Sequence, residues 1–171
     1  EIFVTYDTHF ENYMETAEGK KLPVPHCIKG TDGWSLNDEI AQAVDKKGFT
    51  PVGKITFGSV DLPEIIKKAA GGEEFTIELI GLCTDICVVS NALILKANFP
   101  EMTIAVDSAC CAGVTPEKHN AALDVMESCQ KFEQHVNGAL IFIDTELSFD
   151  CTNKFGLLAP ISSSFAFLFL L

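Results

Sequence analysis

The stretch GLCTDICVVSNALILKA, residues 81–97, places two cysteines and an aspartate between an apolar strand and an apolar helix. Cys87 falls where the strand predicted for 75–82 turns into the helix predicted for 86–98. The first turn of a helix presents unpaired N–H groups and a partial positive charge. Both favour the thiolate, which is the attacking form of cysteine. An ordinary buried cysteine would fit the same position, so position alone leaves open whether Cys87 is a nucleophile or part of the core.

A second group of residues has the types and spacing of metal ligands. Asp7 and His9 directly follow the apolar run EIFVTY, and His26 lies in the segment PHCIKGT. Alternate residues at a strand end can turn toward one ion, and a nearby loop can bring a third ligand. One carboxylate and two imidazoles with open positions suit Zn or Fe(II). D-x-H pairs are also common without a metal, and a histidine beside a proline is often polar surface, so spacing alone leaves both interpretations open.

The elements that must position these residues alternate between short apolar runs and helical patterns. Strands are predicted for 1–6, 52–58, 75–82, 102–108 and 138–144, and helices for 35–47, 61–72, 86–98 and 116–130. Asn37 and Thr115 are predicted N-caps, and Gly71 and Gly72 are predicted to close the helix that precedes them. The alternation predicts a three-layer α/β/α fold with a mainly parallel sheet. Ligands of such sheets bind beyond the carboxyl ends of the strands, near Asp7 and the turn that carries Cys87.

Composition excludes several classes of partner. The chain has 171 residues, 47% of them apolar, which is enough for one domain covering 1–171. Its net charge of -12 repels nucleic-acid backbones and anionic bilayers, so neither is an expected partner. The terminal run FAFLFLL is too short to span a membrane. Seven cysteines, an odd number, without a preceding signal peptide favour free thiols and a cytoplasmic location.

The segment GLCTDICVVSNA resembles the nucleophile segment of the isochorismatase-like cysteine hydrolases, a superfamily that includes the nicotinamidases. Thr84, Asp85, Cys87 and Val88 match its T-D-x-C-V pattern. The resemblance extends over residues 1 to about 130 and implies a Rossmann-like α/β/α fold with Cys87 as nucleophile. It also implies a cis peptide between Leu82 and Cys83, and an oxyanion hole formed by the N–H groups of Cys83 and Cys87.

The resemblance also assigns a role to a lysine. Lys54, in the segment KITFGS, matches the family's catalytic lysine, whose ammonium group would lower the pKa of the thiol further. A single lysine in a short extended segment is, on its own, more often a solvated surface residue. The family context is what favours a place for Lys54 beside Cys87.

The metal motifs resemble those of nicotinamidases, which combine D-x-H with a later P-H segment that ends in G-T. The resemblance implies that Asp7, His9 and His26 hold a divalent metal ion, Zn or Fe(II), with Mn as a third option. Some members add a glutamate, for which Glu18 is the best positional match and Glu15 the alternative. Many nicotinamidases have another histidine shortly after D-x-H, where this chain reads FENY, so the substrate stays open.

Three further cysteines are expected to have no chemical role. Cys27 adjoins His26, but neighbouring residues on an extended loop point apart, so it is not predicted to be a fourth ligand. The Cys110–Cys111 pair is predicted to pack rather than to form a redox centre.

The family's general base has no counterpart near the start of this chain. The hydrolases that the chain resembles begin with a strand that ends in this aspartate, whereas here the first run matches their second strand. One candidate is Asp144, which follows the apolar run GALIFI and precedes Phe149 by five positions. A circularly permuted order would place 138–144 at the centre of the sheet, with Asp144 facing Cys87. In that order SSSFAFLFLL would form part of the missing first helix. Alternatively, 138–144 is the last strand of an ordinary order and is followed by an unrelated tail; in either case 131–171 is atypical.

These residues together predict a metal-dependent cysteine amidase, most similar to a nicotinamidase, that converts nicotinamide to nicotinate and ammonia. The expected catalytic residues are Cys87, Lys54 and Asp144. A sibling hydrolase for isochorismate, a carbamoyl or a ureido compound remains an alternative, as does a non-catalytic ligand-binding member. A thiol redox protein is a poorer match, because Cys83 and Cys87 form C-x-x-x-C rather than C-x-x-C. Similar hydrolases commonly assemble, so a homo-oligomer is expected.

Overall fold

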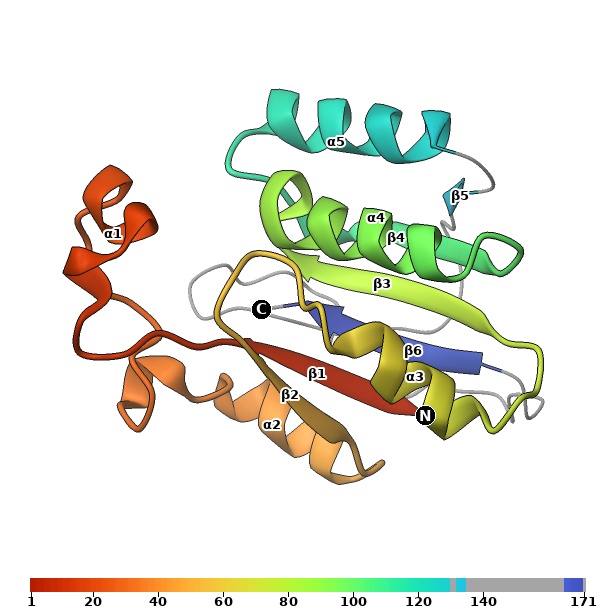
Figure 1. Cartoon of the computed structure of the whole chain (residues 1–171), viewed down its shortest axis with the longest axis horizontal. Helices are drawn as coiled ribbons and strands as arrows, with labels where there is room; N and C mark the ends of the chain where they lie inside the picture. The colour runs from red at the N-terminus through yellow and green to blue at the C-terminus, as the bar shows by residue number, and fades with distance from the viewer. Residues whose placement is uncertain (130–131, 135–164, 171) are drawn as a thin grey trace.

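A single parallel sheet organises the protein (Figure 1). The computed structural model describes residues 1–129, 132–134 and 165–170. Within these ranges six strands pair in the order β2-β1-β6-β3-β4-β5, and every pairing is parallel. The strands are β1 Ile2–Asp7, β2 Thr50–Lys54, β3 Thr76–Leu82, β4 Thr103–Ala112, β5 Phe132–Gln134 and β6 Phe165–Leu170. The helices are α1 Ala17–Lys21, α2 Asp38–Asp45, α3 Leu62–Ala70, α4 Val89–Asn98 and α5 Pro116–Ser128.

The central position of the sheet is filled from the C-terminal part of the chain. β6 lies between β1 and β3, where Phe167 pairs with Ile2 on one side and with Glu78 on the other. The permuted order considered in the sequence analysis gave this position to 138–144, which lies outside the described residues, and gave part of a helix to SSSFAFLFLL. A C-terminal segment does complete the centre of the sheet, but the strand there is 165–170, so the helix expected for SSSFAFLFLL is wrong. An unbroken apolar run such as FAFLFL suits a strand that is covered on both faces.

The helix ends follow the local sequence signals. The side chain of Asn37 accepts a hydrogen bond from the Glu39 N–H at the start of α2, and the Thr115 hydroxyl accepts one from the Lys118 N–H at the start of α5. Gly71 ends α3 in the left-handed conformation, with φ 61°, which glycine adopts without steric cost. The predicted caps are therefore confirmed.

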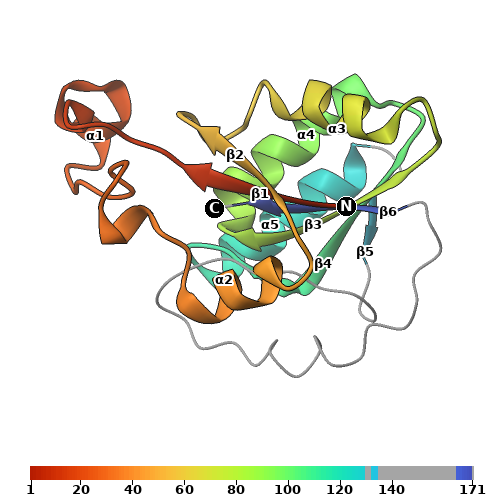
Figure 2. The same cartoon turned by 90° about the horizontal axis from the view of Figure 1, so that it is seen from below.

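Helices cover both faces of the sheet (Figure 2). In this view α3 and α4 lie above the sheet and α2 lies below it. The larger core cluster joins Ile66 of α3, Leu95 of α4 and Met126 of α5 to one face of the sheet. A smaller cluster joins Ile40 and Val44 of α2 to the other face. The predicted three-layer arrangement is confirmed. None of the helices in the described ranges is long and apolar enough to cross a membrane.

Three boundaries differ from the sequence prediction. A π-helical turn, Thr84–Val88, precedes α4, so Cys87 lies in this turn and not in regular helix. β2 ends at Lys54, and the rest of the predicted 52–58 segment forms a loop toward α3. β4 continues to Ala112, four residues beyond the predicted end at 108, because its register against β3 shifts after Leu79 and pairing then resumes.

Candidate active site

Three predicted site residues meet at the carboxyl edge of the sheet. Asp7 ends β1 and Lys54 ends β2, and the parallel register places these two residues side by side. Cys87 follows β3, which lies on the far side of β6. Carboxyl ends of parallel strands share one edge of the sheet. The chain therefore brings together residues that are separated by up to 80 positions in the sequence.

Lys54 lies between the thiol and the carboxylate. Its Nζ is 3.5 Å from Cys87 Sγ and 3.2 Å from Asp7 Oδ1. Lys54 is 3% exposed and Cys87 is 7% exposed. An ammonium group buried to this degree requires anionic or strongly polar partners, and the carboxylate and the sulfur provide them. Lys54 is thus part of a buried polar group and is not a solvated surface lysine.

Burial controls the resting state of the thiol. Desolvation raises the pKa of Cys87 above its ordinary value, and the Asp7 carboxylate adds to the increase, whereas the Lys54 ammonium lowers the pKa. The contribution predicted for Lys54 has the expected direction, but the net shift is upward because desolvation is the largest effect. The expectation of a thiol with a lowered pKa is therefore wrong. A thiol that stays protonated at neutral pH needs a proton acceptor when it attacks.

The turn that carries Cys87 is closed by its own hydrogen bonds. The peptide between Leu82 and Cys83 is cis, as the family resemblance implies. The carbonyl of Cys83 accepts hydrogen bonds from the N–H groups of Ile86 and Val88 at 3.0 and 3.1 Å. These bonds wrap the backbone around Cys87 and fix where its Sγ projects.

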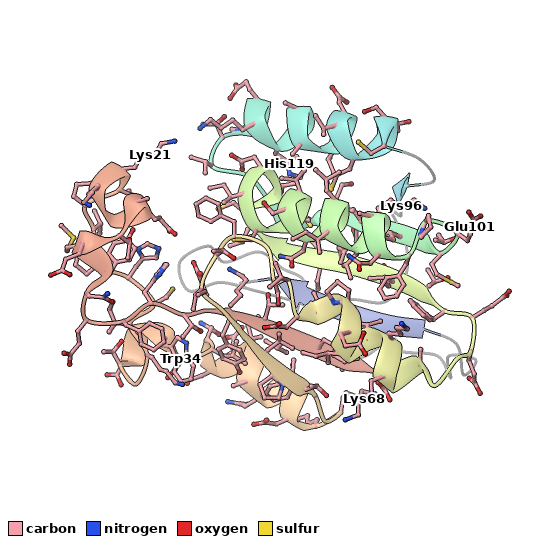
Figure 3. All side chains as sticks on the ribbon, in the orientation of Figure 1. Lys21, Trp34, Lys68, Lys96, Glu101 and His119 are labelled. Atoms are coloured by element: carbon pink, nitrogen blue, oxygen red, sulfur yellow. The ribbon has the colours of Figure 1, made fainter. Side chains whose placement is uncertain are left out.

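The side chains of Thr84 and Asp85 bind this turn to the segment between β4 and α5. Asp85 Oδ1 accepts a hydrogen bond from the Val114 N–H at 2.9 Å. Thr84, which is fully buried, places its hydroxyl 2.8 Å from Nδ1 of His119. Figure 3 shows His119 between α5 and the start of α4. Both contacts hold the turn that carries Cys87 against the segment that connects β4 to α5.

The four predicted metal ligands converge on one point. One ligand atom from each of Asp7, His9, Glu18 and His26 lies within 4.8 Å of the other three. His9 Nε2 is 3.6 Å from Asp7 Oδ2 and 3.6 Å from Glu18 Oε1, and His26 Nε2 is 3.9 Å from the same Glu18 oxygen. Ligands at about 2.1 Å from a zinc ion stand about 3.4 Å apart in tetrahedral geometry and about 3.0 Å apart when the ion takes further ligands. The observed spacing is therefore close to that of a coordination sphere.

Two further observations fit a metal ion at this point. His9 Nε2 is buried and has no hydrogen-bond partner among the described residues, although buried polar atoms are nearly always satisfied. His26 Nδ1 lies 2.8 Å from the Val24 carbonyl. A carbonyl can only accept, so Nδ1 carries the proton and Nε2 presents its lone pair to the other ligands. The donor set and its unsatisfied nitrogen both suit a divalent cation.

The structure distinguishes between the two glutamates. Glu18 belongs to the ligand group, whereas Glu15 is exposed and lies outside it. Cys27 is not one of the four residues either, in agreement with the sequence analysis. Cys110 and Cys111 contact the apolar clusters of the core. The predicted packing role of that pair is confirmed.

Tyr13 organises the arm that carries three of the ligands. This arm, residues 8–30, extends from β1 beyond the sheet and contains α1 (Figure 1). Tyr13 is 1% exposed, its ring centroid lies 4.5 Å from that of His9 and 5.0 Å from that of His26, and its hydroxyl donates to the Leu22 carbonyl. A Cβ at Gly19 would collide with the Tyr13 carbonyl. Glycine therefore allows α1 to approach closely enough for Glu18 to join the histidines.

Trp34 anchors the return of the arm to the sheet. Its Nε1 donates to the Thr8 hydroxyl at 3.0 Å, and that hydroxyl donates to the Tyr6 carbonyl at 2.9 Å. Figure 3 shows Trp34 where this segment meets the body of the protein. A cavity of about 720 Å³ beside Trp34 is lined by Tyr6 and by residues of α2. Because Tyr6 and Asp7 alternate along β1, this cavity lies on the opposite face of the sheet from the Lys54–Cys87 pair.

Some site residues were not found by sequence reasoning. Tyr13, His119 and Asn91 each hold functional segments together, but no motif marks them. Asn91 has a weak signal, because it is a polar residue in an apolar helix and lies four positions after Cys87, on the same helix face. The predicted base, Asp144, lies outside the described residues.

Comparisons with known proteins support the family and the fold. The isochorismatase domain family matches residues 1–137. The chain belongs to the isochorismatase family. This hydrolase family was the one that the T-D-x-C-V and D-x-H motifs indicated, and its fold is the one described above.

Relatives of this isochorismatase-family hydrolase include an uncharacterized isochorismatase family protein, PncA, of Bacillus subtilis strain 168. The two are 29% identical over 129 residues, which cover 71% of this chain and 67% of the relative. The crystal structure of a pyrazinamidase/nicotinamidase from Streptococcus mutans is 28% identical, with a TM-score of 0.63, over 74% of this chain and 70% of that one. A pyrazinamidase of Pyrococcus horikoshii in complex with zinc shares the fold, at 21% identity and a TM-score of 0.57, over 78% of this chain and 74% of that one.

Proposed function

We propose that this protein hydrolyses a small carboxamide through a thioester on Cys87, and that nicotinamide is the substrate, which gives nicotinate and ammonia. The observation that carries the proposal is the position of Asp7. One of its oxygens pairs with Lys54, next to the thiol, and the other faces His9 in the ligand group. A substrate held at the ligand group is thereby placed within reach of the nucleophile.

The ligand group gives the proposal its substrate class. Asp7, His9, Glu18 and His26 would hold a divalent metal ion, and zinc is favoured by the donor set and by the fold relative that contains it. When bound, the ion supplies an open Lewis-acid position for the ring nitrogen of a pyridine or pyrazine carboxamide. His26 and Glu18 are partly exposed, so a small substrate could reach the ligand group from solvent.

The first half-reaction forms the thioester. The Cys87 thiol gives its proton to a carboxylate base, for which the sequence offers Asp144, and the sulfur attacks the carboxamide carbon. The N–H groups of Cys83 and Cys87 stabilise the resulting oxyanion, while Lys54 stabilises the developing thiolate. Asp144 then returns the proton to the amide nitrogen, the C–N bond breaks and ammonia leaves. The raised pKa of Cys87 supports this order, because a protonated thiol requires a base during attack.

The second half-reaction releases the acid. Asp144 takes a proton from water, the hydroxide adds to the thioester carbon and the C–S bond breaks. The carboxylic acid leaves and the sulfur recovers its proton from Asp144, so the enzyme returns to its starting state. Lys54 holds Asp7 and the sulfur in place throughout, because it contacts both.

The test is ammonia release from nicotinamide by the purified, zinc-loaded protein, with benzamide measured in parallel. Benzamide has the same carboxamide but no ring nitrogen, so it should react poorly if the ligand group positions that nitrogen. Cys87→Ala should abolish release from nicotinamide, and mass spectrometry of the wild-type protein during turnover should detect the thioester on Cys87.

Each result has a defined meaning. Equal turnover of benzamide and nicotinamide would contradict the proposed role of the ligand group. Turnover that persists in Cys87→Ala would contradict the thioester mechanism. Inactivity on both amides, with activity on isochorismate or on a carbamoyl or ureido compound, would show that the site acts on another substrate of the family.

A further inference from the structure

The two halves of the candidate site come from opposite parts of the sheet. Lys54 ends β2, whereas Cys87 follows β3, and β1 and β6 lie between these strands. The Lys54–Cys87 contact of 3.5 Å therefore depends on how firmly the exit of β2 is held against the start of α4. Small displacements matter here, because Coulomb interactions weaken with distance and with the entry of water.

One buried side chain joins these two halves directly. Asn91 on α4 is fully buried, and its amide spans from the nucleophile turn to the loop that follows Lys54. Its Nδ2 donates to the Cys87 carbonyl at 2.9 Å and to the Phe57 carbonyl at 3.1 Å. Its Oδ1 accepts from the N–H of Ser59 at 2.9 Å. Both the oxygen and the nitrogen of the amide are thus hydrogen-bonded. The side chain binds one N–H and one carbonyl of the 57–59 backbone, as a neighbouring strand would.

The chemistry of the partners fixes the orientation of the amide. Two carbonyls can only accept and one backbone N–H can only donate, so the oxygen and nitrogen of Asn91 cannot be exchanged. The loop is also in close contact with the helix, because a Cβ at Gly58 would collide with the Ile94 side chain and come within 3.3 Å of Ser90 Cβ. The loop therefore packs on α4 in one defined position.

We propose that Asn91 is a positioning residue that holds the 55–59 loop against α4 and so sets the distance between Lys54 and Cys87. Asn91 contacts neither the Lys54 ammonium nor the thiol sulfur in any of its hydrogen bonds. It acts on the main chain on both sides of the site. The inference concerns the reactivity of the thiol and is tested without the amide substrate.

A double-mutant cycle on Cys87 alkylation tests the proposal. The rate of reaction with iodoacetamide at neutral pH is followed for the Cys87 site by fragmentation mass spectrometry, which separates it from Cys83. Four proteins are compared: wild type, Lys54→Met, Asn91→Ser and the double variant. Serine at 91 can still donate to the Cys87 carbonyl, as Ser90 does to Ile86 at 2.6 Å, but it is too short to reach the loop. The helix bond is thereby retained while the loop contact is removed.

The expected result is strong non-additivity. Lys54→Met should slow alkylation about tenfold or more in the wild-type background, the equivalent of at least one pKa unit. In the Asn91→Ser background the same change should alter the rate by less than about twofold, because Lys54 no longer stands beside the sulfur. Hydrogen exchange of the 55–60 segment should also lose protection in Asn91→Ser.

Asn98→Ala is the matched control, because Asn98 also donates to a carbonyl four residues earlier on α4 but is exposed. It should leave the Lys54 effect and the exchange of 55–60 unchanged. If circular dichroism shows that Asn91→Ser is unfolded, Gly58→Val displaces the same loop from α4 with Asn91 intact, and the Lys54 effect should shrink there too. A Lys54 effect of equal size with and without the loop contact would overturn the proposal.

Discussion

Lys54 Nζ donates a hydrogen bond to Cys87 Sγ over 3.5 Å, although two strands separate β2 from β3 in the sheet. The same ammonium pairs with Asp7 Oδ1 at 3.2 Å. The lysine therefore links the thiol to a carboxylate whose second oxygen belongs to the ligand group. This chain of contacts makes the thiol, the ammonium and the ligand group one connected polar unit.

Replacing Lys54 should move the ionisation of Cys87 to higher pH. Lys54 lowers the pKa of the thiol, whereas burial and Asp7 raise it. In Lys54→Met the lowering effect is lost, so the pKa of the thiol should rise further. The pH profile of Cys87 alkylation should shift upward, and the rate at pH 7 should fall about tenfold or more. Lys96→Met is the control, because Lys96 is a buried lysine toward the other end of α4 that donates to the Met102 carbonyl (Figure 3). A profile that is unchanged in Lys54→Met would show that the contact has no electrostatic effect.

Glu18 and Glu15 should differ in their effect on metal binding. Glu18→Gln removes a carboxylate from the ligand group, so zinc affinity should fall at least about tenfold. Glu15→Gln alters an exposed carboxylate three positions earlier and outside the group, so affinity should stay as in the wild type. Competition with a chromophoric chelator measures both constants. Equal losses in the two variants would indicate a general charge effect instead of coordination.

Gly19 should be essential to the ligand group without being a ligand. The Cβ of Gly19→Ala would strike the Tyr13 carbonyl, and the arm must shift to relieve the contact, which moves Glu18 away from His9. Zinc affinity should fall by about 10–100-fold, the range seen for residues that orient metal ligands. Gly33→Ala is the control, since its Cβ would meet nothing closer than the Thr31 hydroxyl at 3.9 Å. Undiminished affinity in Gly19→Ala would mean that the arm adapts freely.

Asp144 should affect turnover but not the ground-state thiol contact with Lys54. If it is the acid and base of the proposed mechanism, Asp144→Asn should lower kcat by about 10²–10⁴-fold, with metal content retained. Asp150→Asn changes a carboxylate six positions later in the same segment and should have little effect. Full activity in Asp144→Asn would assign the proton transfer to another group.

Local sequence signals determined much of this protein. Asn37, Gly71 and Thr115 mark helix ends through hydrogen bonds and backbone conformations that span only a few residues, so they are readable without tertiary contacts. The strand–turn–helix pattern around Cys87 and the D-x-H pair at the end of β1 also follow from local order. Together they indicated the family, the parallel sheet and the order of the site motifs along the chain.

Only the tertiary structure decided which strand completes the sheet and how the motifs meet. Residues 138–144 and 165–170 are both apolar runs, and pairing with β1 and β3 at once, which selects 165–170, is a long-range property that neither run reveals. The choice of Glu18 over Glu15 depends on the close approach of α1 to Tyr13. The raised pKa of Cys87 depends on burial by the whole fold, because desolvation is set by every layer around an atom and not by its neighbours in sequence.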